Sequence, residues 1–245
     1  MDLLTYMFDR NPQTLVNWKR VKWNDPTFDR VTVVIAKNPR SKKSICAAAD
    51  IAVLGRDIGR NNYLKSLLLD DLYCLDINDV AFARHIFGLL CNGNGVNSNE
   101  SIEKLTITCA HNMRLLVEPL LERAGPLEEL CFLEAGVDDN LVVALVDVFL
   151  QKPWLVPIKL QIAGCEIGVV GCKALGKLLK SQNCSMVELD IAEDKIDDDG
   201  AACLADALKR NGTLKELCLG GNDITSKGWK VFDNAVSCIV NKHCS

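Results

Sequence analysis

The densest run of candidate metal ligands in this chain is Asp194-Lys-Ile-Asp-Asp-Asp-Gly200, whose carboxylates could bind calcium. An EF-hand loop needs oxygen ligands at its first, third and fifth positions and a bidentate glutamate at its twelfth. In this run Lys195 takes the first position and Asp206 the twelfth, so neither end has the required ligand. A row of acids is also typical of the first turn of a helix, because the helix dipole favours negative charge there. We therefore interpret the run as a helix start and predict no metal site.

Twelve cysteines and three histidines are the other candidates for metal binding or nucleophilic catalysis. No C-x-x-C pair occurs, and His85, His111 and His243 lie far apart in the sequence. A chain of this size without a signal peptide needs no disulfide framework, so we interpret most of the thiols as small buried side chains. Cys131 and Cys218 are exceptions, because each lies between two apolar strand positions. We expect them to point outward and to oxidise first.

Other sequence features exclude whole classes of function. The sequence has no phosphate loop, serine nucleophile elbow, zinc-protease or kinase motif, so we predict no catalytic and no cofactor-binding residue. A net charge of −4 without a basic stripe argues against nucleic-acid binding. The longest apolar stretch, residues 141–150, is interrupted by Asp147 and is too short to cross a membrane. Together these features predict a non-enzymatic protein of the reducing cytoplasm that contacts no membrane.

A repeat sets the positions of these residues. Three stretches share the pattern L-x-[LI]-x-x-[CDN]-x-I and begin 29 and then 28 residues apart: Leu160-Gln-Ile-Ala-Gly-Cys-Glu-Ile167, Leu189-Asp-Ile-Ala-Glu-Asp-Lys-Ile196 and Leu217-Cys-Leu-Gly-Gly-Asn-Asp-Ile224. Apolar residues at alternate positions indicate a strand with one buried face. The segment after each stretch predicts a helix, with Gly171, Gly200 or Gly228 near its start. A fixed period of this size predicts a repeat architecture.

Weaker copies of the pattern extend the repeat toward the amino terminus. The equivalent apolar anchors are Val31, Leu67, Leu105, Leu130, Leu160, Leu189 and Leu217. Their spacing resembles the leucine-rich repeats of the ribonuclease-inhibitor type, which have 28–29 residues per unit. One position of each repeat is Asn or Cys in that family. In the last three repeats of this chain it is Cys165, Asp194 and Asn222. In the earlier repeats it does not match the family pattern and is Ala36, Leu72, Ala110 and Ala135.

The resemblance implies an α/β fold, a leucine-rich-repeat solenoid curved into a horseshoe, with parallel strands on the concave face and helices on the convex face. Strands stack at about 4.8 Å and helices need about 10 Å, which bends the stack. We predict an amino-terminal helical cap over residues 1–27, about seven repeats over residues 28–224 that are irregular before residue 127, and a carboxyl-terminal helical cap over residues 225–245.

A solenoid offers a long surface rather than a cleft, so we predict a protein–protein interaction scaffold. Side chains that flank the buried anchors should face the concave side. From these we select as partner-binding residues Asp70, Glu129, Leu133, Glu134, Glu188, Asp190, Glu193 and Glu216. Most are acidic, so the protein partner should present a basic surface. The alternative interpretation is that the acids only keep the solenoid soluble.

Proteins of similar repeat type leave three further alternatives. One is an inhibitor of a basic enzyme, as ribonuclease inhibitors are. A second is an actin-capping module like the tropomodulin repeat domain. Residues 24–31 and 62–67 of this chain resemble the entry segments of that domain. The third, and the one catalytic option, is a GTPase-activating protein of the Ran-activator type, which would need loop arginine or asparagine groups beside the nucleotide.

Overall fold

The computed structural model describes residues 19–20, 23–34, 57–58, 60–70, 101–108 and 127–235. The chain forms two compact units, residues 1–126 and residues 127–245, and each is described by itself. Most of the predicted amino-terminal cap and residues 236–245 of the predicted carboxyl-terminal cap lie outside the described residues, as do Ala36, Leu72 and Ala110. The proposed cap boundaries therefore stay predictions.

Three short parallel strands form the described sheet of the first unit. They are β1 (Arg30–Val34), β2 (Ser66–Asp70) and β3 (Lys104–Thr108), and β2 pairs with both of the others. The register aligns Val31 with Leu67 and Leu67 with Leu105, the anchors that the sequence pattern makes equivalent. Leu67 and Leu105 are buried, and the residues alternating with them are partly exposed. The irregular spacing of this half does not disturb the strand register.

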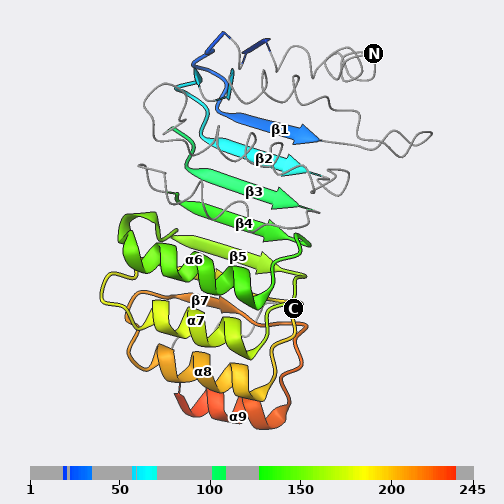
Figure 1. Ribbon diagram of the computed structural model, residues 1–245, viewed down its shortest axis with the longest axis vertical. Coiled ribbons are helices and arrows are strands. Elements are labelled where there is room, and N and C mark those ends of the chain that lie inside the picture. The colour runs from blue at the N-terminus through cyan, green and yellow to red at the C-terminus, as the bar shows by residue number, and fades with distance from the viewer. Residues whose placement is uncertain are drawn as a thin grey trace, which may run out of the picture. The chain divides into compact units, whose positions relative to one another are not determined.

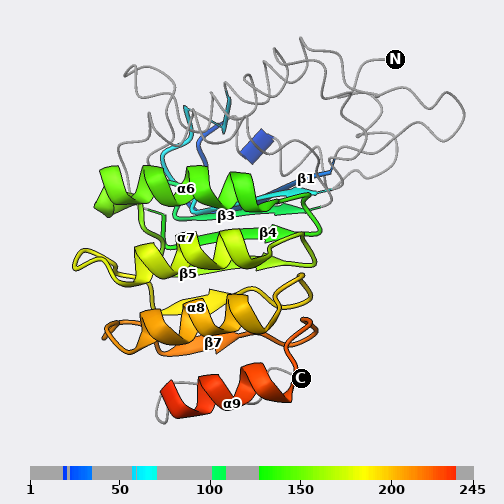
Figure 2. The same cartoon turned by 60° about the horizontal axis from the view of Figure 1, so that its bottom comes forward.

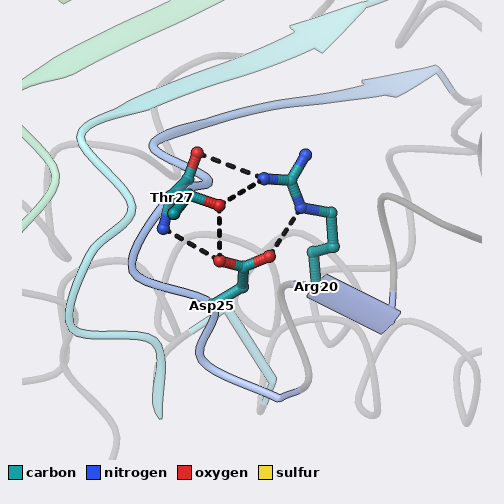
Figure 3. A network of polar contacts seen from close by, with 3 residues as sticks. All are labelled: Arg20, Asp25 and Thr27. Carbon is teal, nitrogen blue, oxygen red and sulfur yellow. Dashed lines mark hydrogen bonds and ion pairs between the residues drawn. The ribbon is translucent and has the colours of Figure 1, made fainter.

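A small polar network lies in the segment before β1 (Figure 3). Arg20 Nε donates to Asp25 Oδ2 at 2.7 Å, and Arg20 Nη2 donates to the Thr27 hydroxyl oxygen at 2.7 Å. The Thr27 hydroxyl and backbone N–H donate to Asp25 Oδ1 at 2.7 and 2.9 Å. The hydrogen bonds from Thr27 and Arg20 lower the pKa of Asp25 to about 2. The Arg20 guanidinium also lies 4.5 Å from the centroid of the Phe28 ring, so the network fixes the turn that leads into β1.

Four parallel strands and four α-helices form the described part of the second unit, residues 127–235. The strands are β4 (Glu129–Leu133), β5 (Lys159–Ala163), β6 (Glu188–Asp190) and β7 (Glu216–Cys218). The helices are α6 (Asp139–Gln151), α7 (Val169–Leu179), α8 (Asp198–Leu208) and α9 (Ser226–Ala235), and a short 3-10 helix, η3 (Pro153–Leu155), follows α6. The strands pair in chain order, with Leu130, Leu160, Leu189 and Leu217 in one register line. This alternation of parallel strands and helices confirms the predicted leucine-rich-repeat solenoid.

The core of the second unit lies between its strand layer and its helix layer. Figures 1 and 2 show α6–α9 stacked one after another beside the strands. The strand anchors are buried, and so are helix residues such as Leu145, Leu175 and Leu204. Burying one such side chain stabilises the fold by about 1.5–3 kcal/mol. The core therefore covers one side of the sheet and leaves the other side to the solvent.

Two aspartates connect successive helices at their amino-terminal ends. Asp139 in the first turn of α6 accepts a hydrogen bond from the Gly171 backbone N–H at 2.9 Å, and Asp198 in α8 accepts one from Gly228 at 3.1 Å. Each carboxylate thus lies at the positive end of the next helix dipole. A Cβ atom on Gly171 or Gly228 would lie 2.6 or 2.4 Å from an Oδ1 atom of these aspartates. This close approach explains why glycine recurs near the helix starts.

Candidate functional site

The side of the β4–β7 sheet that faces away from the helices is the candidate site, and we call it the strand face. Its side chains form four columns that run from repeat to repeat. The first is Glu129, Lys159, Glu188 and Glu216, and the second is Cys131, Gln161, Asp190 and Cys218. The third is Leu133, Ala163, Ala192 and Gly220, and the fourth, in the turns after the strands, is Glu134, Gly164, Glu193 and Gly221.

The first column is acidic, with one internal ion pair. Lys159 Nζ lies 3.3 Å from Glu188 Oε2, and both side chains are more than a third exposed. Partial burial acts to lower the pKa of Lys159, but the hydrogen bond and the charge of Glu188 outweigh it and raise that pKa. At this exposure the pair stabilises the fold by at most about 1 kcal/mol. Its main effect is to neutralise the one lysine of the strand face.

Asp190 in the second column stabilises the sheet and the turn after β6 through hydrogen bonds. Its Oδ2 atom accepts a hydrogen bond from Gln161 Nε2 at 2.8 Å, and its Oδ1 atom accepts one from the Ala192 backbone N–H at 3.1 Å. The carboxylate therefore connects β5 to β6 and holds the first residues of the turn that follows. A substitution at Asp190 would change the fold of that turn together with the charge of the strand face.

The second column contains the two cysteines that the sequence pattern singles out, Cys131 and Cys218. Cys131 lies on the strand face as expected, but it is only 6% exposed, and this burial disfavours the early oxidation that the sequence pattern indicates. Its short side chain lies in register with the longer Gln161 and is flanked on its own strand by Glu129 and Leu133. Cys218 is disulfide-bonded, whereas Cys165, Cys172, Cys184 and Cys203 have free thiols.

The fourth column has a left-handed backbone in all four repeats. The φ angles are 50° at Glu134, 65° at Gly164, 57° at Glu193 and 71° at Gly221. Glycine adopts this conformation freely, but a glutamate there is strained. A Cβ atom added to Gly164 or Gly221 would lie 3.3 or 2.9 Å from the Cγ atom of the glutamate one repeat earlier. Each glutamate side chain therefore lies over the glycine of the next repeat.

Asp194 lies in the turn after β6 and is 7% exposed. Its Oδ1 atom accepts hydrogen bonds from the backbone N–H groups of Cys165 and Ile167, both at 3.1 Å. Its Oδ2 atom is buried and has no hydrogen-bond partner. Burial, with the nearby charges of Asp190 and Asp139, raises the pKa of Asp194 to about 7 against the lowering effect of the two backbone hydrogen bonds. Asp194 therefore connects the turn after β6 to the turn after β5.

The structure places seven of the eight predicted partner-binding residues on the strand face of the second unit. They are Glu129, Leu133, Glu134, Glu188, Asp190, Glu193 and Glu216. Asp70 instead ends β2 in the first unit, where the Thr108 hydroxyl donates to its carboxylate. Whether any of these residues contacts a partner stays a prediction.

Two features of the second unit were missed by sequence reasoning. The left-handed glutamates had a signal, because aligning the repeats places Glu134 and Glu193 at the position of Gly164 and Gly221. Trp154 and Ile158, in the connection from α6 to β5, are 53% and 47% exposed and had no such signal. Lys152 Nζ lies 5.9 Å from the centroid of the Trp154 ring, a cation–π arrangement that packs the lysine against the indole.

Metal binding and membrane spanning find no support in the residues that the structure describes. Within those ranges, no group of three or more His, Cys, Asp or Glu side chains could hold a metal ion. Over the same part of the chain, no helix has the length and apolar character needed to span a bilayer.

Known proteins resemble parts of this chain. A family model described as leucine-rich repeat matches residues 182–205 and 210–232, which contain β6, α8, β7 and most of α9. Protein CARMIL of Dictyostelium discoideum is 30% identical over 89 residues, which are 36% of this chain and 8% of that protein. This chain therefore spans less than a tenth of the length of that curated relative.

Among solved structures, a Bacteroides fragilis protein is similar over 93% of this chain and 68% of its own, with a TM-score of 0.53 at 18% identity. This likeness concerns the fold alone. The C-terminal domain of tropomodulin from Caenorhabditis elegans covers 91% of both chains at 11% identity, but its TM-score of 0.34 is too low to carry an argument. The repeat spacing, the strand register and the family match agree on one type of repeat.

Proposed function

Because this chain is a leucine-rich-repeat protein of the ribonuclease-inhibitor type, we propose that it binds a protein partner with a basic surface through the strand face of β4–β7. Leucine-rich repeats are protein-interaction scaffolds, and their stacked units provide an extended surface rather than an enclosed cleft. The family is typical of non-enzymatic proteins. An inhibitor of a basic enzyme would be a special case of this function, with the enzyme as the partner.

The charge of the strand face is the observation that carries the proposal. Its acids are Glu129, Glu134, Glu188, Asp190, Glu193 and Glu216, and its one base is Lys159, which Glu188 pairs. Charged surfaces of this kind guide the encounter with a partner of opposite charge and exclude partners of the same charge. The proposed partner therefore presents lysine and arginine side chains.

The helix layer argues against the solubility interpretation of these acids. The α7 segment carries Lys173 and Lys177 and is followed by Lys180, and α8 is followed by Lys209 and Arg210. Lys177 and Lys180 pair with Asp147 and Asp206, so charges of both signs alternate on this side. Solubility is served by any distribution of charge. Acids gathered on the uncovered side of the sheet are explained better by a partner.

Charge reversal on the strand face tests the proposal. The test variant combines Glu188→Lys, Glu193→Lys and Glu216→Lys, and it spares Asp190 because that carboxylate holds the turn after β6. The control variant combines Asp147→Lys, Asp199→Lys and Asp206→Lys on the helix layer. Each protein is used to capture partners from reduced cell extract at low and moderate salt, and bound proteins are identified by mass spectrometry.

We expect the wild type and the helix-layer control to retain a stoichiometric partner that the strand-face variant loses. Capture should weaken by about tenfold or more on charge reversal and should also weaken at moderate salt. Circular dichroism and the thermal midpoint establish that each variant is folded. Equal capture by the folded strand-face variant would reject the proposal.

A further inference from the structure

The strand face also specifies the form of the partner segment, on the premise that the proposed function is correct. We propose that this segment is a basic amphipathic α-helix that lies across the strands along the stacking direction, between the first and fourth columns of the strand face. Its apolar side would rest on the third column, and lysine or arginine side chains on its two flanks would meet the acids at the two edges.

The width between the two acidic edges matches an α-helix. In β4 the first-column residue Glu129 and the third-column residue Leu133 are four strand residues apart, which corresponds to roughly 13 Å, and the fourth-column residue Glu134 follows directly. An α-helix with its side chains is about 10–12 Å across. A helix placed between these edges brings cations on both flanks within reach of carboxylates. Cations on one flank alone would contact only one of the two acidic edges.

The third column of the floor between the edges is low and apolar, whereas Gln161 and Asp190 in the second column are polar and bond to each other. Leu133, Ala163 and Ala192 occupy the third column, and Gly220 follows them in the last repeat. Their side chains, Leu133 apart, extend no further than a methyl group, and Cys131 beside them is nearly buried. Small side chains let the backbone of a helix come close to the sheet. Leu133 at one end of the floor stands higher and provides an apolar contact.

Hydrogen bonding favours a helix over an extended segment on this floor. The middle strand β5 pairs with β4 on one side and β6 on the other, so its backbone groups are already used. Gln161 and Asp190 bond to each other. An extended segment would leave backbone N–H and C=O groups without partners where it touches the apolar floor, which is unfavourable. A helix satisfies its backbone internally and needs only side-chain contacts.

The spacing of the acids also fits helical repeats. Glu134 and Glu193 are two strands apart, or about 10 Å, and residues i and i+7 of a helix rise by about 10.5 Å. Glu188 and Glu216 lie on adjacent strands, about 4.8 Å apart, which is close to one helical turn of about 5.4 Å. One helix can therefore present cations in register with both edges.

Synthetic peptides test the inference directly on the full chain. The probe is a fluorescently labelled peptide of about 18 residues with leucine and alanine on one helical face and lysine on both flanks. Two control peptides keep its net charge: one reorders the same residues so that the faces do not segregate, and one carries prolines in its centre. Affinity is measured by fluorescence anisotropy, and peptide helicity by circular dichroism. We expect the probe to become helical and to bind at least about tenfold more tightly than either control.

Two substitutions locate the probe on the strand face. Ala192→Phe raises the floor without changing charge, and Val170→Phe is its control on the exposed side of α7. Glu193→Gln removes one charge from the edge, and Asp199→Asn is its control on α8. We expect the two strand-face variants to weaken probe binding by about three- to tenfold and the two controls to leave it unchanged. The thermal midpoint of each variant confirms that it folds.

The outcomes separate this inference from the proposed function. If the reordered or proline peptide binds as tightly as the probe, or if Ala192→Phe and Glu193→Gln leave probe binding unchanged, the helix inference is overturned. In that case capture of a partner that depends on Glu188, Glu193 and Glu216 would leave the proposed function standing. If the folded charge-reversed variant still captures its partner, the proposed function fails, and the helix inference fails with it.

Discussion

The turn after β6 and the turn after β7 follow the same backbone path with different polar side chains. The β6 turn has Glu193 in the left-handed position and Asp194 in the buried position after it. The β7 turn has Gly221 and Asn222 at these two positions. The β7 pair meets the needs of the turn, because glycine accepts a positive φ and asparagine both donates and accepts hydrogen bonds.

The buried position shows the difference most clearly. Asn222 Oδ1 accepts from the Ile196 backbone N–H at 3.0 Å, while Nδ2 donates to the carbonyls of Ile191 and Leu219 at 2.8 and 3.1 Å. Asp194 accepts from the equivalent Ile167 N–H, but its second oxygen has no partner. An ionised carboxylate cannot donate a hydrogen bond to a carbonyl group. The folded β6 turn therefore disfavours the ionised form of Asp194.

We therefore expect the β6 turn to be less stable than the β7 turn, and its two polar side chains, Glu193 and Asp194, are both acidic. Strained or poorly satisfied groups are retained in proteins where surrounding structure holds them, and they are concentrated at functional sites. Glu193 is such a group, and it lies on the edge of the strand face. Substitutions that convert one turn toward the other should change stability by amounts that differ in size and in sign.

Asn222→Asp gives the β7 turn the chemistry of the β6 turn and should have the largest effect. The variant loses both donors to Ile191 and Leu219 and places an additional carboxylate in a partly buried position. We expect the free energy of unfolding at pH 8 to fall by about 3–5 kcal/mol, measured by urea denaturation. Asn183→Asp in the exposed loop after α7 is the matched control. Equal effects of the two substitutions would contradict the prediction.

Asp194→Asn converts the β6 turn in the opposite direction and should stabilise the protein at neutral and alkaline pH. Burial raises the pKa of Asp194 from 3.8 to about 7 in the folded state. The folded wild type therefore binds more protons than the unfolded chain between these values, so its stability falls as pH rises from about 4 to about 7 and then stays level. The variant lacks this loss and should be more stable by about 2–4 kcal/mol at pH 8.

The pH dependence distinguishes this effect from ordinary repacking. Urea unfolding of the wild type and of Asp194→Asn at pH 4, 6 and 8 gives the difference in their free energies of unfolding. The contributions of the other titrating groups are the same in both proteins and cancel in this difference. The advantage of the variant should be smallest at pH 4 and should grow up to pH 7. A difference that is constant over this range would show that Asp194 does not titrate as described.

Gly221→Ala tests the left-handed position and should have the smallest effect. The φ angle there is 71°, and the new Cβ atom would lie 2.9 Å from Glu193 Cγ. We expect a loss of about 1–2 kcal/mol, measured by thermal denaturation. In a Glu193→Gly background the contact with Cγ is absent, so the loss should shrink by about 0.5 kcal/mol. Strictly additive effects would mean that the two side-chain positions do not interact.

The sequence predicted the repeat well because the repeat depends on local patterns. Anchors such as Leu160, Leu189 and Leu217 recur at fixed intervals, and equivalent strands stacked in register satisfy every anchor in the same way. The same register predicted which side chains would share a face, and this placed Glu129, Glu188 and Glu216 in one column. The acidic character of the strand face therefore follows from the periodicity of the sequence alone.

Contacts between repeats were decided only by the tertiary structure. The burial of Cys131 depends on neighbours on its own and adjacent strands, and the capping of α7 by Asp139 joins residues one repeat apart. The left-handed backbone at Glu193 arises because the turn path is imposed by the repeats on either side, against the preference of the residue. Periodicity thus determined which residues are equivalent, while packing between repeats determined what each equivalent position requires of its side chain.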